Sequence, residues 1–101
     1  MSGWILNSEA LDGLEAMVLR LPTGSVKTLG RTARADFIVQ APLVSRLHCR
    51  LTADASNQLV VEDLGSQNGT RVNGRKVDRA TLKAGDTLTV GRVQFSVAHG
   101  A

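Results

Sequence analysis

The sequence predicts an all-β fold, a sandwich or a barrel built from short strands. Residues with branched β-carbons are abundant, with 11 Val, 8 Thr and 2 Ile against only 3 aromatic residues, and such residues favour strands. Groups rich in Gly, Pro, Asn and Asp recur at short intervals, which is typical of turns. Between these groups lie runs of three to five residues that have the polarity pattern of strands.

The expected strands follow from these short runs. Residues 26–29 alternate loosely and residues 48–52 alternate clearly, which favours half-buried strands, whereas residues 37–39 form the continuous apolar run of a buried strand. Asn73-Gly74 is the strongest two-residue hairpin signal in the chain. The other expected strands are residues 59–62, 70–72, 75–77, 87–90 and 93–97.

The segment from residue 8 to residue 21 carries two conflicting patterns. It is rich in Ala, Leu, Glu and Met, and Leu11, Leu14 and Val18 recur at helical spacing. Asp12-Gly13 interrupts the pattern, because a glycine inside a helix costs about 1 kcal/mol relative to alanine. We therefore predict two strands, near residues 4–7 and 15–21, joined by a loop, with a helix as the alternative.

Length and composition restrict the class of protein. The chain has 101 residues, 43% of them hydrophobic and 21% charged, which suits one globular domain over residues 1–101 with its core at about 4–97. No apolar run approaches the roughly 20 residues that cross a bilayer, and the first residues lack the features of a secretory signal. We therefore predict a cytoplasmic domain that has no membrane partner.

The sequence contains no pattern typical of metal, cofactor or catalytic chemistry. Cys49 is the only cysteine, which excludes an internal disulfide and the Cys-based zinc sites. The chain also has no paired carboxylates, no nucleotide-binding glycine loop and no nucleophile elbow. We predict that the protein uses no metal and no cofactor and is not an enzyme.

The net charge of +3 is too small to identify a partner, but the placement of the cations is informative. Cationic side chains lie near predicted loops, at Arg31, Arg34, Arg46, Arg71, Arg75, Lys76 and Arg79. This placement favours an anionic partner, although the last four residues also suit an ordinary solvated face. A nucleic-acid-binding β-domain would stack bases on exposed aromatic side chains, and the chain has no Tyr and no aromatic ladder. We predict no nucleic-acid partner.

Four short segments place small residues and hydrogen-bond donors in predicted loops. They are Gly30-Arg31, residues 45–48, residues 63–70 and residues 72–74. Arg31 and Arg46 carry guanidinium groups that suit phosphate oxygens, and Gly65 and Gly69 tolerate tightly bent backbone. Hydroxyl and amide donors are supplied by Ser45, Ser66, Gln67 and Asn68. At one end of a sandwich, such loops would form an oxyanion-binding surface.

At these residues the chain resembles the forkhead-associated (FHA) domain, a family that reads phosphothreonine peptides. The family signature is Gly-Arg, then Ser-x-x-His, then Asp-Leu-Gly-Ser-x-Asn-Gly-Thr, then Val-Asn-Gly. In this sequence the four motifs start at Gly30, Ser45, Asp63 and Val72, and residues 82–91 match the closing strand pair. The resemblance covers the chain from about Trp4 to Val97. It implies a β-sandwich of about eleven mostly antiparallel strands with recognition loops at one end.

The resemblance also implies a role for each polar motif residue. Arg31 would ion-pair with the phosphate, Ser45 would hydrogen-bond a phosphate oxygen, and Arg46 would add a backbone or side-chain donor. Asn68 would hold the peptide backbone beside the phosphothreonine. Gln67 stands where relatives often have a phosphate-binding Ser or Thr, so we expect its amide or its backbone N–H to contact phosphate. Ser66 is a further candidate donor to phosphate.

Other residues are implied to be structural or to select the peptide. The structural group consists of Gly30, His48, Asp63, Gly65, Gly69 and Thr70. Within it, His48 is expected to brace the recognition loop as a buried, neutral side chain. Leu43, two residues before the motif serine, is expected to favour an aliphatic peptide residue three positions after the phosphothreonine. Asn73 has two interpretations, a plain hairpin turn and a peptide contact.

The implied function is recognition of a threonine-phosphorylated protein or peptide by a non-catalytic adaptor in bacterial Ser/Thr-kinase signalling. One alternative is a degenerate FHA module that binds its partner without phosphate. A second is a catalytic Ser45–His48 pair, which we do not predict because a serine just before a strand usually caps or turns the chain. Cys49 points to the opposite side of its strand from His48, and we expect it in the core with Trp4, Phe37 and Phe95.

Overall fold

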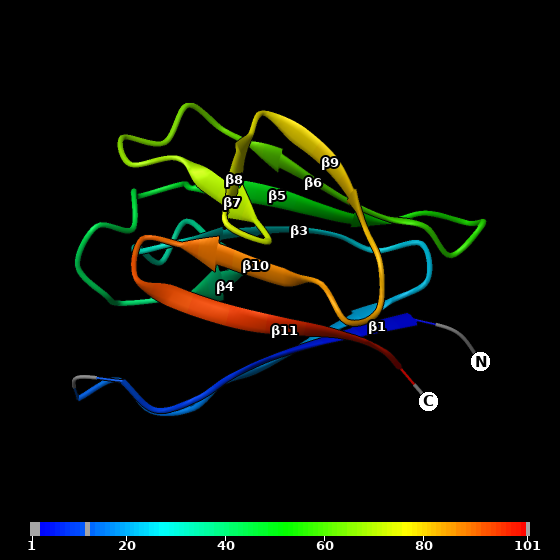
Figure 1. The fold of residues 1–101 in the computed structure, drawn as a ribbon, viewed down its shortest axis with the longest axis horizontal. Coiled ribbons are helices and arrows are strands. Elements are labelled where there is room, and N and C mark those ends of the chain that lie inside the picture. Colours follow the sequence, from blue (N-terminus) through cyan, green and yellow to red (C-terminus); the bar gives the residue numbers. More distant parts are fainter. Residues whose placement is uncertain (1–2, 12, 101) are drawn as a thin grey trace.

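A computed structural model describes residues 3–11 and 13–100, which form eleven strands in two sheets packed face to face (Figure 1). The six-stranded sheet has the order β2–β1–β11–β10–β7–β8. Its strands are β1 (Gly3–Ser8), β2 (Val18–Pro22), β7 (Thr70–Val72), β8 (Arg75–Val77), β10 (Thr87–Val90) and β11 (Val93–His99). The five-stranded sheet has the order β4–β3–β5–β6–β9. Its strands are β3 (Val26–Gly30), β4 (Phe37–Ile38), β5 (Cys49–Ala53), β6 (Leu59–Asp63) and β9 (Arg79–Leu82).

Alternation along the strands produces the two layers. In β11, Val93, Phe95 and Val97 are buried while the residues between them face solvent, because neighbouring side chains of a strand point to opposite faces of its sheet. In β5, Leu51 and Ala53 are buried in the same alternating way. The inner faces of the two sheets therefore meet in one apolar core.

The predicted all-β sandwich is confirmed, including its mostly antiparallel strands, since only β3 and β4 pair in parallel within the described residues. The helix alternative for residues 8–21 is wrong, because β1 ends at Ser8 and β2 begins at Val18. Between them, backbone hydrogen bonds join Leu11 to Leu14 in a tight turn. Asp12, part of the turn signal in the sequence, lies outside the described residues.

The core contains most of the side chains that the sequence assigned to it. Trp4, Cys49 and Phe95 are buried, whereas Phe37 is only partly buried and packs against the core from the short edge strand β4. The strand β9 was not among the predicted runs. It follows β8 after the single residue Asp78 and belongs to the other sheet. No turn-rich segment separates the two strands, so the sequence gives no signal that a new strand begins.

Several loops gather at one end of the sandwich, opposite the two chain termini (Figure 1). They are the β1–β2, β4–β5, β6–β7 and β10–β11 connections, together with the segment that follows β3. The three motifs that begin at Gly30, Ser45 and Asp63 all lie in these connections and at the ends of the strands beside them. Among residues 3–11 and 13–100 we find no helix that could span a lipid bilayer.

Candidate functional site

Arg31 and Ser45 lie side by side because hydrogen bonds join the segment after β3 to the β4–β5 loop. The Arg31 N–H donates to the carbonyl oxygen of Ser45 at 3.0 Å. The Arg31 Nε–H donates to the carbonyl oxygen of Val44 at 2.9 Å. Arg31 as a whole is an exposed residue. Since Nε uses only one of the five N–H donors of the guanidinium group, its two terminal nitrogens remain available to an oxyanion.

Ser45 is held at three of its polar groups. Its carbonyl accepts from Arg31, its N–H donates to Nδ1 of His48 at 3.1 Å, and its Oγ accepts from the N–H of Gln67 at 3.0 Å. A hydroxyl that accepts a hydrogen bond keeps its own proton for donation. Within the described residues nothing accepts that proton, so Ser45 can donate it to a bound ligand.

His48 supports the position of Ser45 from the interior of the protein. Its side chain is fully buried, its Nδ1 accepts from Ser45, and its Nε2 lies 2.8 Å from the carbonyl oxygen of Gly69. Because Nδ1 is an acceptor, Nε2 carries the proton and donates to Gly69, which is the pattern of a neutral imidazole. His48 thereby links the β4–β5 loop to the β6–β7 loop. Its Nδ1 faces the backbone N–H of Ser45 and not its hydroxyl, which is not the geometry of a nucleophile and its base.

The β6–β7 loop folds around the carboxylate of Asp63. Oδ2 accepts from the N–H groups of Gly65 and Ser66 at 3.0 Å each, and Oδ1 accepts from the hydroxyls of Ser66 and Thr70. Partial burial raises the pKa of Asp63, but hydrogen bonds from Ser66, Thr70 and Gly65 outweigh that effect, so the pKa lies below its ordinary value. The carboxylate is therefore ionised at neutral pH and holds the loop in shape.

Ser66 belongs to this bracing network. Its hydroxyl donates its single proton to Asp63 and accepts from the N–H of Gly69 at 2.9 Å. A hydroxyl has only one proton to donate, so Ser66 cannot donate to a ligand while this network is intact. The geometry therefore gives it a role that differs from the phosphate contact suggested by the sequence.

Asn68 and Leu43 connect the same two loops on their outer side. The side-chain Nδ2 of Asn68 donates to the carbonyl oxygen of Leu43 at 3.2 Å. Leu43 has a φ of +70° and is 51% exposed. Apolar side chains rarely adopt this left-handed backbone conformation, which costs about 1–3 kcal/mol and persists where surrounding contacts impose it.

The remaining motif residues take more modest positions. The Gln67 side chain is exposed, and its backbone N–H holds Ser45. Arg46 is also exposed, and a β-carbon on Gly30 would lie 2.0 Å from its carbonyl oxygen. Only glycine lets the backbone approach so closely. Gly69, with a φ of +84°, supplies the left-handed conformation at the end of the β6–β7 loop.

Asn73 is not brought to this cluster. Its Nδ2 donates to Asp86 at 3.0 Å, and its Oδ1 accepts from the N–H of Thr87 at 2.9 Å. The hairpin tip thus lies against the start of β10. The β6–β7 loop, residues 64–69, which we call the recognition loop, instead joins β7 at Thr70, opposite Val90 at the other end of β10. This geometry supports the plain hairpin interpretation of Asn73 and does not support the peptide contact.

Sequence reasoning missed the carbonyl groups of Leu43 and Val44, which orient Asn68 and Arg31. A backbone carbonyl is present at every position, so no sequence signal marks the ones that matter. Among the residues that the structure describes, no group of three or more His, Cys, Asp or Glu side chains is placed to hold a metal ion.

Comparison with known proteins places the chain among FHA domains. A family model for the FHA domain matches residues 27–91. The ABC transporter ATP-binding/permease protein Rv1747 of Mycobacterium tuberculosis is 38% identical over 80 residues, which are 79% of this chain. The chain spans only 9% of the length of that transporter, and 46% of the length of another mycobacterial relative.

Solved structures agree with this assignment. The FHA domain of the CT664 protein from Chlamydia trachomatis superposes with a TM-score of 0.87 at 27% identity, covering 98% of this chain and 99% of that one. A second structure, from work on phosphothreonine-dependent FHA domain interactions, gives a TM-score of 0.82 at 28% identity and covers 95% of each chain. With three of its four motifs folded into one loop cluster and a family model that matches residues 27–91, the chain belongs to the FHA domain family.

Proposed function

We propose that this chain is a non-catalytic module that binds threonine-phosphorylated partners in a cytoplasmic Ser/Thr-kinase pathway. One observation carries the proposal: consecutive carbonyls of Val44 and Ser45 hold Arg31, and the donors left over on Arg31 and Ser45 have no partner among the described residues. A guanidinium and a hydroxyl placed in this way suit a tetrahedral oxyanion. The similarity to an FHA domain studied for phosphothreonine-dependent interactions supports phosphothreonine as that oxyanion.

The physical basis of recognition is charge and hydrogen bonding. A phosphothreonine carries about −1.5 to −2 charges at neutral pH and three acceptor oxygens. In the proposed complex the terminal nitrogens of Arg31 and the hydroxyl of Ser45 donate to these oxygens, and exposed Arg46 and Gln67 flank the group. Asn68, with one amide N–H used on Leu43, keeps its carbonyl oxygen and second N–H for the peptide backbone.

Two finer preferences belong to the same proposal. Charge cannot distinguish phosphothreonine from phosphoserine, so the choice depends on packing of the threonine methyl group, which is worth about 1–3 kcal/mol. The exposed Leu43 side chain offers an apolar surface beside the site, and we propose that it favours an aliphatic residue three positions after the phosphothreonine. An oriented phosphopeptide library that favours Asp or Glu at this position would contradict that preference.

The decisive test is calorimetry with one peptide in three forms, carrying Thr, phosphothreonine or phosphoserine. We expect binding of the phosphothreonine form only, or at least about tenfold tighter than the phosphoserine form. Equal affinity for all three forms would overturn the proposal in favour of an FHA module that binds without phosphate.

Substitution of Arg31 tests which residue binds the phosphate. We expect Arg31→Ala to weaken phosphopeptide binding by at least about 100-fold, because charge-assisted hydrogen bonds are worth about 1.5–3 kcal/mol each. The matched control is Arg20→Ala, which removes an exposed arginine from β2 in the other sheet. An equal loss in both variants would show that general positive charge, and not the site, attracts the peptide.

A further inference from the structure

A concave surface opens next to the loops that hold Arg31 and Ser45. It has a volume of about 750 Å³ and lies between the β1–β2 loop, the start of the β4–β5 loop and the turn between β10 and β11. Its apolar lining includes Leu11, Leu14, Met17, Ile38, Pro42 and Val93. We call this surface the apolar groove.

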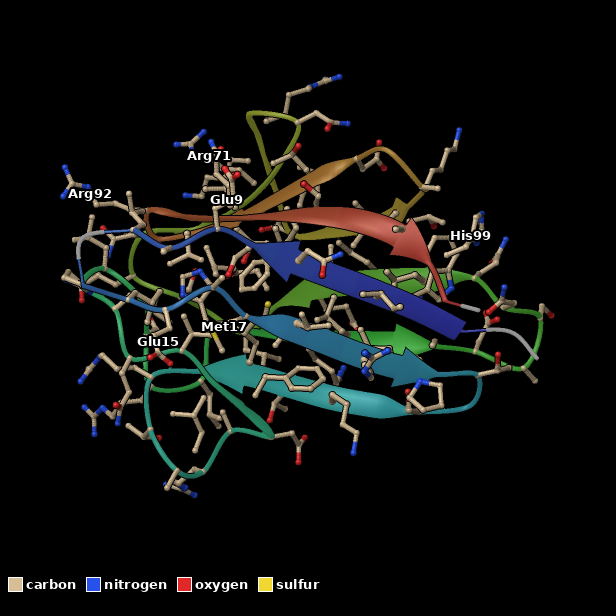
Figure 2. The ribbon with its side chains drawn as sticks, turned by 90° about the horizontal axis from the view of Figure 1, so that it is seen from below. Glu9, Glu15, Met17, Arg71, Arg92 and His99 are labelled. Carbon is tan, nitrogen blue, oxygen red and sulfur yellow. The ribbon has the colours of Figure 1, made fainter. Side chains whose placement is uncertain are left out.

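The apolar groove keeps large hydrophobic side chains in contact with solvent. Leu11 and Ile38 are each 41% exposed. Soluble domains that expose adjoining apolar side chains commonly use them for binding. Glu15 and Arg92 also line the groove, and Figure 2 shows them on opposite sides of the loop that joins β1 and β2. An apolar floor with a few charged groups at its edges is the usual composition of a ligand-binding cleft.

The apolar groove and the phosphate-binding loops share a wall. Ala41 and Pro42 line the groove, and the same segment continues through Leu43 to Ser45 in the phosphate site. Gly91 packs tightly on the segment, since a β-carbon there would lie 3.0 Å from backbone atoms of Pro42 and Leu43. Leu43, strained and half exposed, stands on the boundary between the two surfaces. A peptide that left the phosphate site across Leu43 would therefore pass over the segment that forms one wall of the groove.

We propose that the apolar groove binds a hydrophobic segment of the same phosphorylated partner, a few residues along the chain from the phosphothreonine. This inference rests on the proposed function, because it assigns the groove to the partner that the phosphate site holds. We choose this occupant because the groove and the phosphate site share the segment from Ala41 to Ser45, so a partner bound at one lies next to the other. A volume of about 750 Å³ is within the ~300–1,000 Å³ typical of ligand clefts, so it accommodates several side chains.

Such an arrangement divides recognition into two parts. The phosphate acts as the switch, since without it Arg31 and Ser45 have no oxyanion to bind. The hydrophobic segment adds affinity and selects among phosphorylated proteins, because burial of apolar surface contributes roughly 25 cal/mol per Å². Linking the two binding events on one chain raises the effective concentration of the second.

The test compares short and extended phosphopeptides by calorimetry. The short probe carries phosphothreonine with three alanines on each side, and two longer probes add Leu-Ile-Ala-Leu-Ile to one end or the other. We expect at least one extension to tighten binding by about tenfold or more. With ¹⁵N-labelled protein, the same extension should shift the amide signals of Leu14, Met17, Ile38 and Val93, which the short probe leaves unchanged.

Variants locate the effect. Leu11→Asp and Ile38→Asp place a charge in the apolar groove at exposed positions, and both should remove the gain from extension while keeping the affinity for the short probe. The matched control is Val26→Asp, which alters an exposed apolar residue of β3 outside the groove. This control should keep the full gain. Urea unfolding of all three variants identifies any loss of binding that comes from misfolding. Misfolding would also lower the affinity for the short probe.

The outcomes separate the two proposals. Phosphate-dependent binding of the short probe without any gain from either extension would overturn the groove inference and leave the proposed function intact. Equal affinity for phosphorylated and unphosphorylated short probes would overturn the proposed function, and the groove inference with it. A gain that survives in Ile38→Asp would also overturn the inference. The inference would also be overturned if the protein dimerised and Ile38→Asp abolished the dimer, since the groove would then hold a second copy of the chain.

Discussion

Two Asn-Gly dipeptides lie five residues apart in this chain and have different surroundings. Asn68-Gly69 ends the recognition loop, and Asn73-Gly74 forms the tip of the β7–β8 hairpin. Both glycines have a positive φ, +84° and +83°. The Asn68 side chain makes one hydrogen bond, to the carbonyl of Leu43 in another loop. The Asn73 side chain uses both its nitrogen and its oxygen, on Asp86 and Thr87.

The difference lies in which polar groups remain for a partner. Asn68 joins two loops and retains hydrogen-bonding capacity that a peptide can use, whereas Asn73 spends its amide on closing the hairpin against β10. Each dipeptide also has its own aspartate. Asp63 accepts four hydrogen bonds in the recognition loop, and Asp86 accepts from Asn73 and from the N–H of Lys83. Identical residues therefore leave hydrogen-bonding groups unused at one place and use them to close a hairpin at the other.

The largest expected effect is the loss of the brace beneath Asn68-Gly69. His48→Ala leaves the N–H of Ser45 and the carbonyl of Gly69 without their buried partner, and it opens a cavity. We expect the free energy of unfolding to fall by about 3 kcal/mol or more, measured by urea denaturation. His99→Ala, at the other and exposed histidine, is the control. A loss below about 1 kcal/mol in His48→Ala would show that the recognition loop does not depend on this brace.

Asn73→Ala should affect stability and leave binding unchanged. It removes two side-chain hydrogen bonds and places alanine at a φ of +51°, a conformation that alanine disfavours. We expect a loss of about 2 kcal/mol in the free energy of unfolding with the same affinity for a phosphothreonine peptide. A large drop in affinity at unchanged stability would restore the peptide contact suggested by the sequence.

Asn68→Ala should show the opposite behaviour. Its single hydrogen bond is exposed, so the free energy of unfolding should change by less than about 1 kcal/mol. Affinity for the phosphothreonine peptide should fall about tenfold, equivalent to about 1.4 kcal/mol, as calorimetry would measure. Asn68→Asp supplies a comparison, since it retains an acceptor but cannot donate to Leu43. If Asn68→Ala instead bound the peptide normally, the contrast between the two asparagines would be lost.

The smallest expected effect is the change in the free energy of unfolding at low pH. The pKa of Asp63 is lowered, because its hydrogen bonds outweigh the raising effect of burial, and hydrogen bonds from Asn73 and Lys83 lower the pKa of Asp86. A carboxylate with a lowered pKa stabilises the folded state above its unfolded pKa of about 3.9, and this contribution disappears as the pH falls through the folded value. Stability should therefore decrease below about pH 4.

Two variants sharpen this acid comparison between the loops. Asp63→Asn and Asp86→Asn should each flatten the fall in the free energy of unfolding between pH 5 and pH 2. The change should be greater for Asp63, which accepts more hydrogen bonds. Equal pH profiles in the wild type and both variants would show that other carboxylates cause the acid sensitivity.

Most strands and the motif residues could be predicted from the sequence, but the separate role of each residue within the site could not. Alternation in residues 93–97 and the hairpin signal at Asn73-Gly74 depend on neighbours in sequence, and both were found correctly. β9 was missed because the chain passes from one sheet to the other at Asp78 without a turn-rich segment. The sequence suggested Ser66 as a ligand donor, but in the structure its hydroxyl donates a hydrogen bond to Oδ1 of Asp63.

By itself, the sequence determined that the chain forms strands, which faces of these strands are apolar, and where loops with phosphate-type donors occur. These properties depend on side-chain shape and polarity over a few residues. Only the tertiary structure decided which donors remain unused and which surfaces adjoin the site. Those depend on backbone carbonyls such as that of Val44 and on contacts such as Gly91 with Leu43. Groups far apart along the chain meet there only after the two sheets have packed.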